Sequence, residues 1–229
     1  RAVAHLMKVG EMRSYYRLVP REFWVAMITM GAVVVFDVLP ALIIGVVSST
    51  LNGEAVVKGR SLFRDRLGES VAASSVTLVD DPTNPKAYTA TDVDGEGLAA
   101  RRNVLIQDGV LQQFVHNSYS ARRSGTVSTG NATRGGFAGT PGVGCLALSL
   151  VPGTRNQPEL IADVDDGLLV LQMQGLHSGV NPISGDFSTG AAGLLISNGV
   201  VGAPVREITI ASTLQRMLLD IVEIGGDIE

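Results

Sequence analysis

The residue types that are best suited to chemistry gather in one glycine-rich stretch, residues 175–190. It contains His177, Asp186, several hydroxyl side chains and an Asn-Pro step, and apolar runs flank it on both sides. Glycine allows sharp turns and the close approach of another chain, and scaffolds commonly present binding groups on polar loops between strands. The stretch therefore predicts a binding loop, although its composition fits an ordinary strand connection equally well.

A serine nucleophile is the second chemistry that this stretch could supply. His177 as base and Asp186 as orienting acid could combine with one of three nearby hydroxyl groups, those of Ser178, Ser184 and Ser188. No surrounding motif resembles the strand-turn-helix elbow that presents a catalytic serine. An autonomous hydrolase using His177 and a nearby serine is therefore an alternative rather than the main prediction.

Metal and thiol chemistry find little support elsewhere in the chain. The three histidines, His5, His116 and His177, have no second His or Glu at helical spacing, so they predict no zinc hydrolase site. Residues 91–97 resemble a calcium loop but lack its closing Glu, which predicts a solvated turn. Cys145 stands among apolar and small residues and predicts a buried, unreactive thiol. His116 follows an apolar run and suits a hydrogen-bonded turn.

The totals favour a sheet-rich protein without a nucleic-acid partner. Of 229 residues, 45% are hydrophobic, 5% are aromatic and 27 are glycines, which suits many tight turns better than a helical bundle. The net charge of -4 is spread without basic blocks, so no phosphate-binding surface is predicted. A single cysteine excludes an internal disulfide, and together with the lack of an evident cleavable signal it predicts a cytoplasmic protein.

One long apolar stretch, residues 23–51, has the length of a membrane span, because about 20 apolar residues cross a bilayer. Asp37 and Pro40 interrupt it near its middle, where an ionised carboxylate is costly and proline breaks a helix. The interruption instead predicts a buried strand at residues 32–36 and a helix at 39–51 that an Asn-Gly pair closes. Because the stretch is long enough to cross a bilayer, a membrane-anchored binding module stays a second alternative.

Two Asx-Gly pairs indicate how the rest of the chain is built. Asp108-Gly109 and Asn198-Gly199 each separate two apolar, strand-like runs, a pattern typical of antiparallel hairpins. We expect an α+β fold with a mostly antiparallel sheet or partly closed barrel, two helices near the N-terminal side and one C-terminal helix. Further strands are expected at residues 76–79, 167–173 and 208–210, helices at 54–67 and, capped by Ser212 or Thr213, at 214–222, and a mobile surface loop at 124–144.

Several segments carry a specific combination of motifs, among them Gly-Arg-Ser-Leu-Phe-Arg-Asp-Arg-Leu-Gly-Glu and Pro-Val-Arg-Glu-Ile-Thr-Ile. These segments lie at residues 59–69, 76–82, 175–188, 204–214 and 225–227. Together they resemble the TldD/TldE family, also called PmbA or modulator of DNA gyrase, and its TldE side in particular. The resemblance implies that residues 32–229 form the family's β-rich C-terminal domain. Residues 1–31 are then expected to be an appendage, a remnant of the hinge to a missing N-terminal domain.

The same resemblance implies a catalytically silent subunit. TldD subunits of this family are metalloproteases with a His-Glu-x-x-x-His helix and a later cysteine ligand, and TldE subunits pair with them. Carried over through the Arg-Leu-Gly match, the motif falls on Ile44, Gly45 and Ser49, and the cysteine position falls close to Gly175. Such side chains cannot hold a zinc ion. We therefore expect no cofactor in this chain and zinc in a TldD partner.

The expected function is that of a TldE-like subunit of a cytoplasmic peptidase for unfolded peptides. Glycine-rich edges could add an extended peptide as an extra strand, because main-chain hydrogen bonds tolerate many sequences. The expected partner is a TldD-type metalloprotease in a heterodimer, with a homodimer open for the chain alone. The residues expected to contact the peptide are Arg134, Gly175, His177, Gly179, Asn181 and Asp186.

Overall fold

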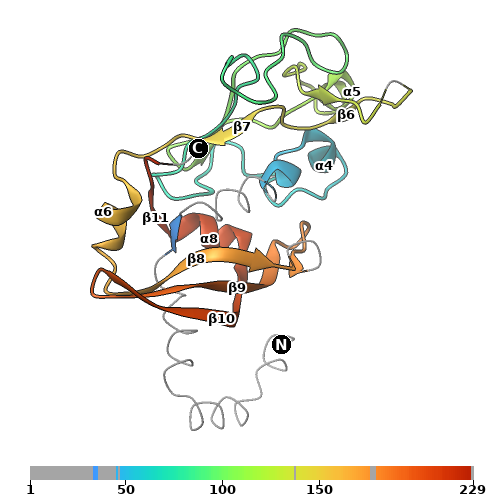
Figure 1. The fold of residues 1–229 in the computed structure, drawn as a ribbon. Helices are drawn as coiled ribbons and strands as arrows, with labels where there is room; N and C mark the ends of the chain where they lie inside the picture. Colours follow the sequence, from blue (N-terminus) through green and yellow to red (C-terminus); the bar gives the residue numbers. More distant parts are fainter. Residues whose placement is uncertain (1–32, 36–44, 46, 137, 176–178, 228–229) are drawn as a thin grey trace, which may run out of the picture.

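The computed structural model describes residues 33–35, 45, 47–136, 138–175 and 179–227. The described strands form a four-stranded sheet, a three-stranded sheet and two strand pairs, and short helices lie between and beside them (Figure 1). This arrangement confirms an α+β fold that is mostly antiparallel. No closed barrel is formed by these strands, so the partly closed barrel stays a prediction.

The four-stranded sheet has the order β4 (Val110–Leu111), β3 (Asn103–Gln107), β2 (Leu78–Asp80) and β7 (Leu148–Leu150). The predicted hairpin between β3 and β4 is confirmed, because Asp108 and Gly109 have positive φ angles of 49° and 80°. Two consecutive positive φ angles are what this two-residue turn requires. Among the described strands β7 pairs only with β2, so β7 is one edge of the sheet.

The three-stranded sheet consists of β8 (Asp166–Gln174), β9 (Asp186–Ser197) and β10 (Val200–Thr213), with β9 in the centre. Asn198 and Gly199, with φ angles of 48° and 73°, turn β9 into β10 and confirm the second predicted hairpin. The strands expected at residues 167–173 and 208–210 are confirmed as parts of β8 and β10. The glycine-rich stretch at 175–190 is accordingly the β8–β9 connection together with the start of β9.

The helices outside the N-terminal segment are short. They are α4 (Gly53–Val57), α5 (Ser118–Arg123), α6 (Gln157–Ile161) and α8 (Leu214–Leu219). Thr213 caps α8, as expected, by accepting a hydrogen bond from the Arg216 N–H at 3.2 Å. The predicted end of this helix at residue 222 is wrong, because the chain enters β11 (Ile221–Ile224), which pairs in parallel with β1 (Val33–Val35).

The helix expected at residues 54–67 is wrong beyond the end of α4. The Asn52 side chain accepts hydrogen bonds from two backbone N–H groups of α4, so Asn52 begins this helix instead of closing the preceding one. Gly59 has a φ of 68°, and turns follow it. Phe63 therefore reaches the core from a turn and not from a helix. The apolar residues of this segment have the spacing of one face of a helix, which explains the wrong prediction.

The main core joins the four-stranded sheet to α8 and to the helical residues near position 50. Its fully buried side chains include Val47, Leu51, Phe63, Leu105 and Leu218. Burial of an aliphatic or aromatic side chain of this size contributes about 1.5–3 kcal/mol. The N-terminal helical segment is thus attached to the core through Val47 and Leu51, which fixes the direction of the residues on its opposite face.

The expectation of a mobile surface loop at residues 124–144 is wrong at residues 131–133 and 142–143, which are buried or paired in strands. β5 (Ala132–Thr133) pairs with β6 (Gly142–Val143), and Asn131 lies fully buried beside them. The Asn131 side chain donates hydrogen bonds to Asp80 Oδ2 at 2.6 Å and to the Gly144 carbonyl at 3.2 Å. Buried polar groups that satisfy one another in this way hold the segment in place.

The long apolar stretch at residues 23–51 lies largely outside the described residues, and so do Asp37 and Pro40. Within it, residues 33–35 form β1 and residues 45 and 47–50 are helical, in agreement with the predicted strand and helix. Among the described residues, none of the helices combines the length and the hydropathy that crossing a bilayer requires.

Candidate functional site

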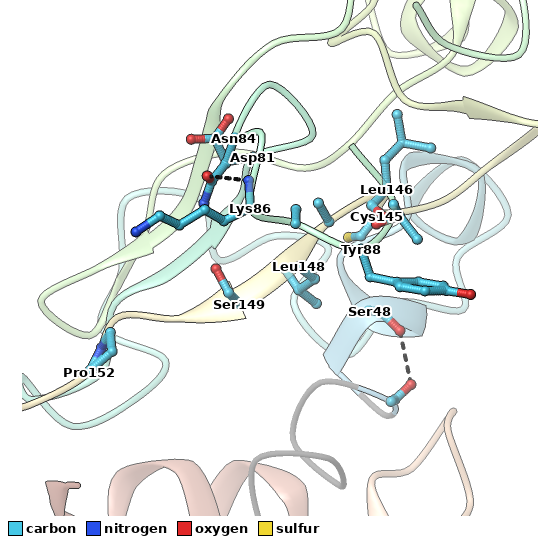
Figure 2. A pocket seen from close by; sticks show the side chains of 14 residues that line it. Ser48, Asp81, Asn84, Lys86, Tyr88, Cys145, Leu146, Leu148, Ser149 and Pro152 are labelled. Carbon is cyan, nitrogen blue, oxygen red and sulfur yellow. Dashed lines mark hydrogen bonds between the residues drawn. The ribbon is translucent and has the colours of Figure 1, made fainter. Parts of the chain in front are cut away.

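A cavity of about 1130 Å³ lies beside β7, between the loop at residues 81–89 and the helical residues 45 and 47–50 (Figure 2). The helix, the loop and the segment around β7 each contribute part of its wall. The residues that line it are Gly45, Ser48, Asp81, Asn84, Lys86, Ala87, Tyr88, Thr89, Cys145, Leu146, Ala147, Leu148, Ser149 and Pro152.

Gly45 is the residue through which the helix opens onto this cavity. It is exposed, and a Cβ atom at this position would meet no other atom within 4 Å. The Ser48 hydroxyl donates a hydrogen bond to the Gly45 carbonyl at 2.9 Å, as Figure 2 shows. Ser49 is also exposed, whereas Ile44, the third residue of the degenerate motif, lies outside the described residues. A longer side chain at position 45 would therefore extend into free space.

Asp80 is buried behind the part of the cavity wall that Leu146 and Ala147 form. Its fully buried carboxylate accepts hydrogen bonds from the N–H groups of Leu146 and Ala147, at 2.9 and 2.6 Å, and from Asn131. Burial raises the pKa of Asp80, since desolvation outweighs these hydrogen bonds, which lower it. The carboxylate thereby fixes the turn that leads into β7.

Cys145 lies on this turn with its side chain half-buried. Burial, with a smaller contribution from the nearby Asp80 carboxylate, raises the pKa of its thiol to about 12. The thiolate is the nucleophilic form of cysteine, and it is disfavoured here. The prediction of an unreactive thiol agrees with this environment.

The β8–β9 connection is folded tightly against α8. The Asn181 side chain accepts hydrogen bonds from the N–H groups of Ile183 and Ser184, at 3.0 and 3.3 Å. Gly185 has a φ of 81°, and its carbonyl accepts a hydrogen bond from the first N–H of α8 at 2.8 Å. The Ser184 hydroxyl donates to Asp186 Oδ2 at 2.7 Å. Asn181 and Asp186 therefore stabilise the turn itself.

Two further peptide-binding candidates in this connection are the glycines at its ends. The Gly179 N–H donates a hydrogen bond to the Gly175 carbonyl at 2.7 Å. A Cβ atom at Gly179 would collide with the Ser188 carbonyl of β9, so this glycine allows a close approach of two parts of the same chain. His177 and Ser178 lie outside the described residues, so the serine triad stays a prediction.

Arg134, the remaining peptide-binding candidate, follows β5 in a different part of the fold. Its Nε donates to the Gly95 carbonyl at 2.7 Å and its Nη1 to the Gly139 carbonyl at 3.3 Å. No hydrogen bond or ion pair between described residues joins Arg134 to the β8–β9 connection. Its guanidinium therefore joins the loop between β5 and β6 to the acidic turn at residues 91–97.

The acidic turn at residues 91–97 and His116 have structural roles. Asp94 is buried, and its carboxylate accepts hydrogen bonds from the N–H groups of Glu96, Leu98 and Ala132. His116 is buried too, with its Nδ1 3.1 Å from the Ser120 hydroxyl, and burial lowers its pKa. Within the described ranges no three His, Cys, Asp or Glu side chains are grouped so that they could hold a metal ion.

Sequence reasoning missed the loop residues that line the cavity, above all Lys86 and Tyr88. The Tyr88 side chain is fully exposed and lines the cavity together with Cys145 and Ser48 (Figure 2). The only local signal is a run of Asp, Pro, Asn and Pro residues, which indicates turns but not the side of the fold that they cover.

Residues 29–229 match the sequence pattern of the PmbA/TldA metallopeptidase C-terminal domain. The metalloprotease PmbA of Escherichia coli O157:H7 is 34% identical over 218 residues, which are 95% of this chain and 45% of that protein. A metalloprotease TldD homolog of Haemophilus influenzae is 32% identical over 160 residues, which are 70% of this chain and 33% of that protein. The chain thus spans less than half the length of these relatives.

Solved structures agree with these sequence matches. TldE from Thermococcus kodakarensis gives a TM-score of 0.76 at 28% identity, covering 91% of this chain and 49% of that chain. A Thermotoga maritima protein described as a modulator of a DNA gyrase gives a TM-score of 0.75 at 34% identity, covering 82% and 42% of the two chains. The chain therefore belongs to the TldD/TldE family, also called the PmbA or modulator-of-DNA-gyrase family, and matches its C-terminal domain.

Proposed function

We propose that this chain is a non-catalytic, TldE-like subunit that pairs with a TldD-type zinc metalloprotease to degrade or process unfolded peptides. The observation that carries the proposal is the helix beside the cavity. There the family resemblance carries the glutamate and the second histidine of the TldD motif onto Gly45, which lines the cavity, and onto the exposed Ser49. The likeness to a solved TldE supports the same assignment.

The donor groups at these positions do not fit a zinc ion. Protein zinc sites use imidazole, thiolate or carboxylate ligands at about 2.0–2.3 Å. Gly45 offers no donor atom and Ser49 offers only a hydroxyl, while Ile44 in the sequence is an alkyl side chain. The chain's single cysteine lies next to β7, and burial keeps it protonated. The catalytic metal of the complex is accordingly assigned to the TldD-type partner.

Co-expression with a TldD-type metalloprotease tests this proposal. We expect the two chains to co-elute as a heterodimer in size-exclusion chromatography. The complex should cleave a fluorescent, unstructured peptide in a buffer of cytoplasm-like pH and ionic strength. The lone chain should leave the peptide intact, whether it elutes as a monomer or as a homodimer. Failure of the two folded chains to associate, with folding verified by circular dichroism, would contradict the proposal.

The autonomous-hydrolase alternative makes a different prediction for the same assay. If the lone chain cleaved the peptide, and His177→Ala removed this cleavage while the chain stayed folded, the activity would belong to a serine site of this chain. If the chain is a catalytically silent subunit, the lone wild-type chain does not cleave the peptide. His177→Ala should then weaken peptide binding or have no effect.

A further inference from the structure

His116 is a titratable side chain that lies buried where α4 and α5 begin. It is only 6% exposed. A Cβ atom on Gly53, the first residue of α4, would be 2.2 Å from its Nδ1, so this helix packs directly on the ring. Nδ1 also lies 3.1 Å from the hydroxyl of Ser120, a fully buried residue of α5. The imidazole therefore fills the contact between the two helices, and a charge on it would be largely withdrawn from water.

This environment accepts the neutral imidazole and disfavours the charged one. The Ser120 hydroxyl can donate to a neutral ring nitrogen or accept from it. The first N–H groups of a helix carry a partial positive charge, and both α4 and α5 begin beside the ring. Burial lowers the pKa of His116 below its ordinary value of 6.5.

The charged side chains on the surrounding elements do not compensate a proton on His116. On α4, Glu54 forms an ion pair with Lys58. The Glu96 carboxylate accepts a hydrogen bond from the first N–H group of α5 at 2.9 Å. On α5 itself the charged residues are the basic Arg122 and Arg123, and residues 128–131 carry no charge. Among the described residues, none of the acids forms an ion pair with the imidazole.

Hydrogen bonds connect His116 to the wall of the cavity. Its N–H donates to Thr129 Oγ1 at 2.7 Å, and this hydroxyl lies 2.7 Å from Asn131 Oδ1. The Asn131 amide donates to Asp80, whose carboxylate accepts hydrogen bonds from the N–H groups of residues 146 and 147. A displacement of His116 would therefore disturb the cavity wall as well as the two helices.

We propose that His116 is a pH-sensitive switch, in which uptake of a proton by the imidazole opens the contact between α4 and α5. A buried charge without a partner is costly, so the charged ring is stable only where water reaches it, and protonation and opening occur together. The switch goes beyond the proposed function, because neither a partner subunit nor a peptide takes part in it.

The direction of the pH dependence follows from the two states of the ring. In the open form the imidazole titrates near its ordinary 6.5, whereas in the closed form its pKa is lower. The closed form is therefore fully favoured above pH about 6.5, and it loses stability as the pH falls from there toward the lowered pKa. Because each opening takes up one proton, the equilibrium constant for opening rises by up to about tenfold per pH unit in this window.

Hydrogen–deuterium exchange of the wild type and His116→Gln tests the proposal on the full chain. Glutamine can form a hydrogen bond but does not titrate in this range. Both chains retain Asp80, and comparing them at the same pH cancels the pH dependence of exchange itself. Between pH about 6.5 and about 5.5 we expect the wild type to lose up to about tenfold in protection relative to the variant in residues 53–57 and 116–131. β8, which belongs to the other sheet, is the internal control. A difference between the chains that is constant with pH would overturn the proposal, because it would show a purely structural role.

A second measurement covers the case in which His116→Gln does not fold. NMR titration of the ring C–H signals of the wild type gives the pKa of each histidine, and the variants His5→Gln and His177→Gln identify the signal of His116 by elimination. We expect a pKa below 6.5, with the amide signals of Gly53 and Thr129 changing in the same pH range. Titration of His116 at or above 6.5, or titration that leaves these amide signals unchanged, would refute the switch.

Discussion

At the scale of single residues, the proposed function depends most on Gly45. It lies in a helix that Val47 and Leu51 attach to the core, and its exposed side opens onto the cavity. No neighbouring atom requires a glycine there, since an added Cβ would meet nothing within 4 Å. Packing therefore does not require a glycine at position 45, and its effect is the absence of a side chain from the cavity.

Gly45→Ala should accordingly stabilise the protein. Alanine is favoured over glycine in a helix by about 0.5–1 kcal/mol, and no contact opposes the change. Gly153→Ala is the control, because its Cβ would collide with the Ile224 carbonyl of β11. Overpacking of this kind costs about 1–3 kcal/mol. Urea unfolding followed by circular dichroism measures both, and a destabilised Gly45→Ala variant would contradict this account of the helix.

Asp80 should make stability depend on pH in a defined direction. Its pKa in the folded protein is raised above the ordinary 3.8, so the folded state holds this proton more tightly than the unfolded chain. The contribution is fully present below the ordinary pKa and is lost as pH rises through the raised value. Asp80→Asn cannot titrate, so its stability relative to the wild type should improve as pH rises across this window.

Urea unfolding at a series of pH values measures this difference. Asp65→Asn serves as the control, since its side chain is 90% exposed. A gap between the wild type and Asp80→Asn that is constant with pH would show that burial of the carboxylate has no net effect on its titration.

Cys145 should react slowly with alkylating reagents in the folded protein. With a pKa of about 12, only a small fraction of its thiol is ionised near neutral pH, and the thiolate is the reactive form. We expect iodoacetamide at pH about 8 to label the native chain far more slowly than the urea-unfolded chain, in which the pKa returns to about 8.5. Mass spectrometry follows the labelling, and equal rates would contradict the raised pKa of the thiol.

At the scale of secondary-structure elements, two asparagine caps of the same type have different consequences. Asn156 caps α6 at the surface through a capping box with Glu159. Asn52 caps α4 and also donates a hydrogen bond from its Nδ2 to the Val143 carbonyl of β6 at 2.6 Å. Asn52 therefore connects the start of α4 to the β5–β6 hairpin.

Asn52→Ala should cost more stability than Asn156→Ala. Loss of a cap costs about 1 kcal/mol, which is the effect expected for Asn156→Ala. Asn52→Ala also removes the hydrogen bond to β6, worth about another 1 kcal/mol. Thermal and urea unfolding of the two variants measure this difference. Equal costs would mean that the contact between α4 and β6 contributes nothing to the fold.

Elements that neighbouring residues specify could be predicted from the sequence, whereas elements that depend on contacts between residues far apart in the chain could not. Asp108-Gly109 and Asn198-Gly199 specify their hairpins within two residues. By contrast, Asn131 becomes buried because its amide meets Asp80, which is distant in sequence. The parallel pairing of β1 with β11 has the same long-range origin.

The candidate site divides in the same way. Gly45 and Ser49 are predicted as degenerate motif positions only through the family resemblance and its Arg-Leu-Gly match, and their role stays a prediction. The free edge of β7 and the nearby Tyr88 could not, because pairing with β2 decides which side of β7 is open. The residue types of Asn181 and Asp186 predict a binding role, which stays a prediction, whereas their hydrogen bonds show that they stabilise a turn.

At the scale of the whole molecule, the chain provides a sheet-rich domain with an open strand edge and no metal-binding constellation among its described residues. It spans 45% of its PmbA relative and 49% of the solved TldE chain. In the proposed complex this domain supplies surface for the unfolded peptide, and the TldD-type partner supplies the hydrolytic metal. The division of labour makes catalysis depend on association.

The metal content of the separated chains tests this division most directly. The chain and a TldD-type metalloprotease are purified together, separated, and each is analysed for zinc by mass spectrometry and for cleavage of an unstructured peptide. We predict that the zinc stays with the TldD-type chain and that this chain alone is metal-free and inactive. Stoichiometric zinc in this chain, together with peptide cleavage in the absence of a partner, would contradict the account.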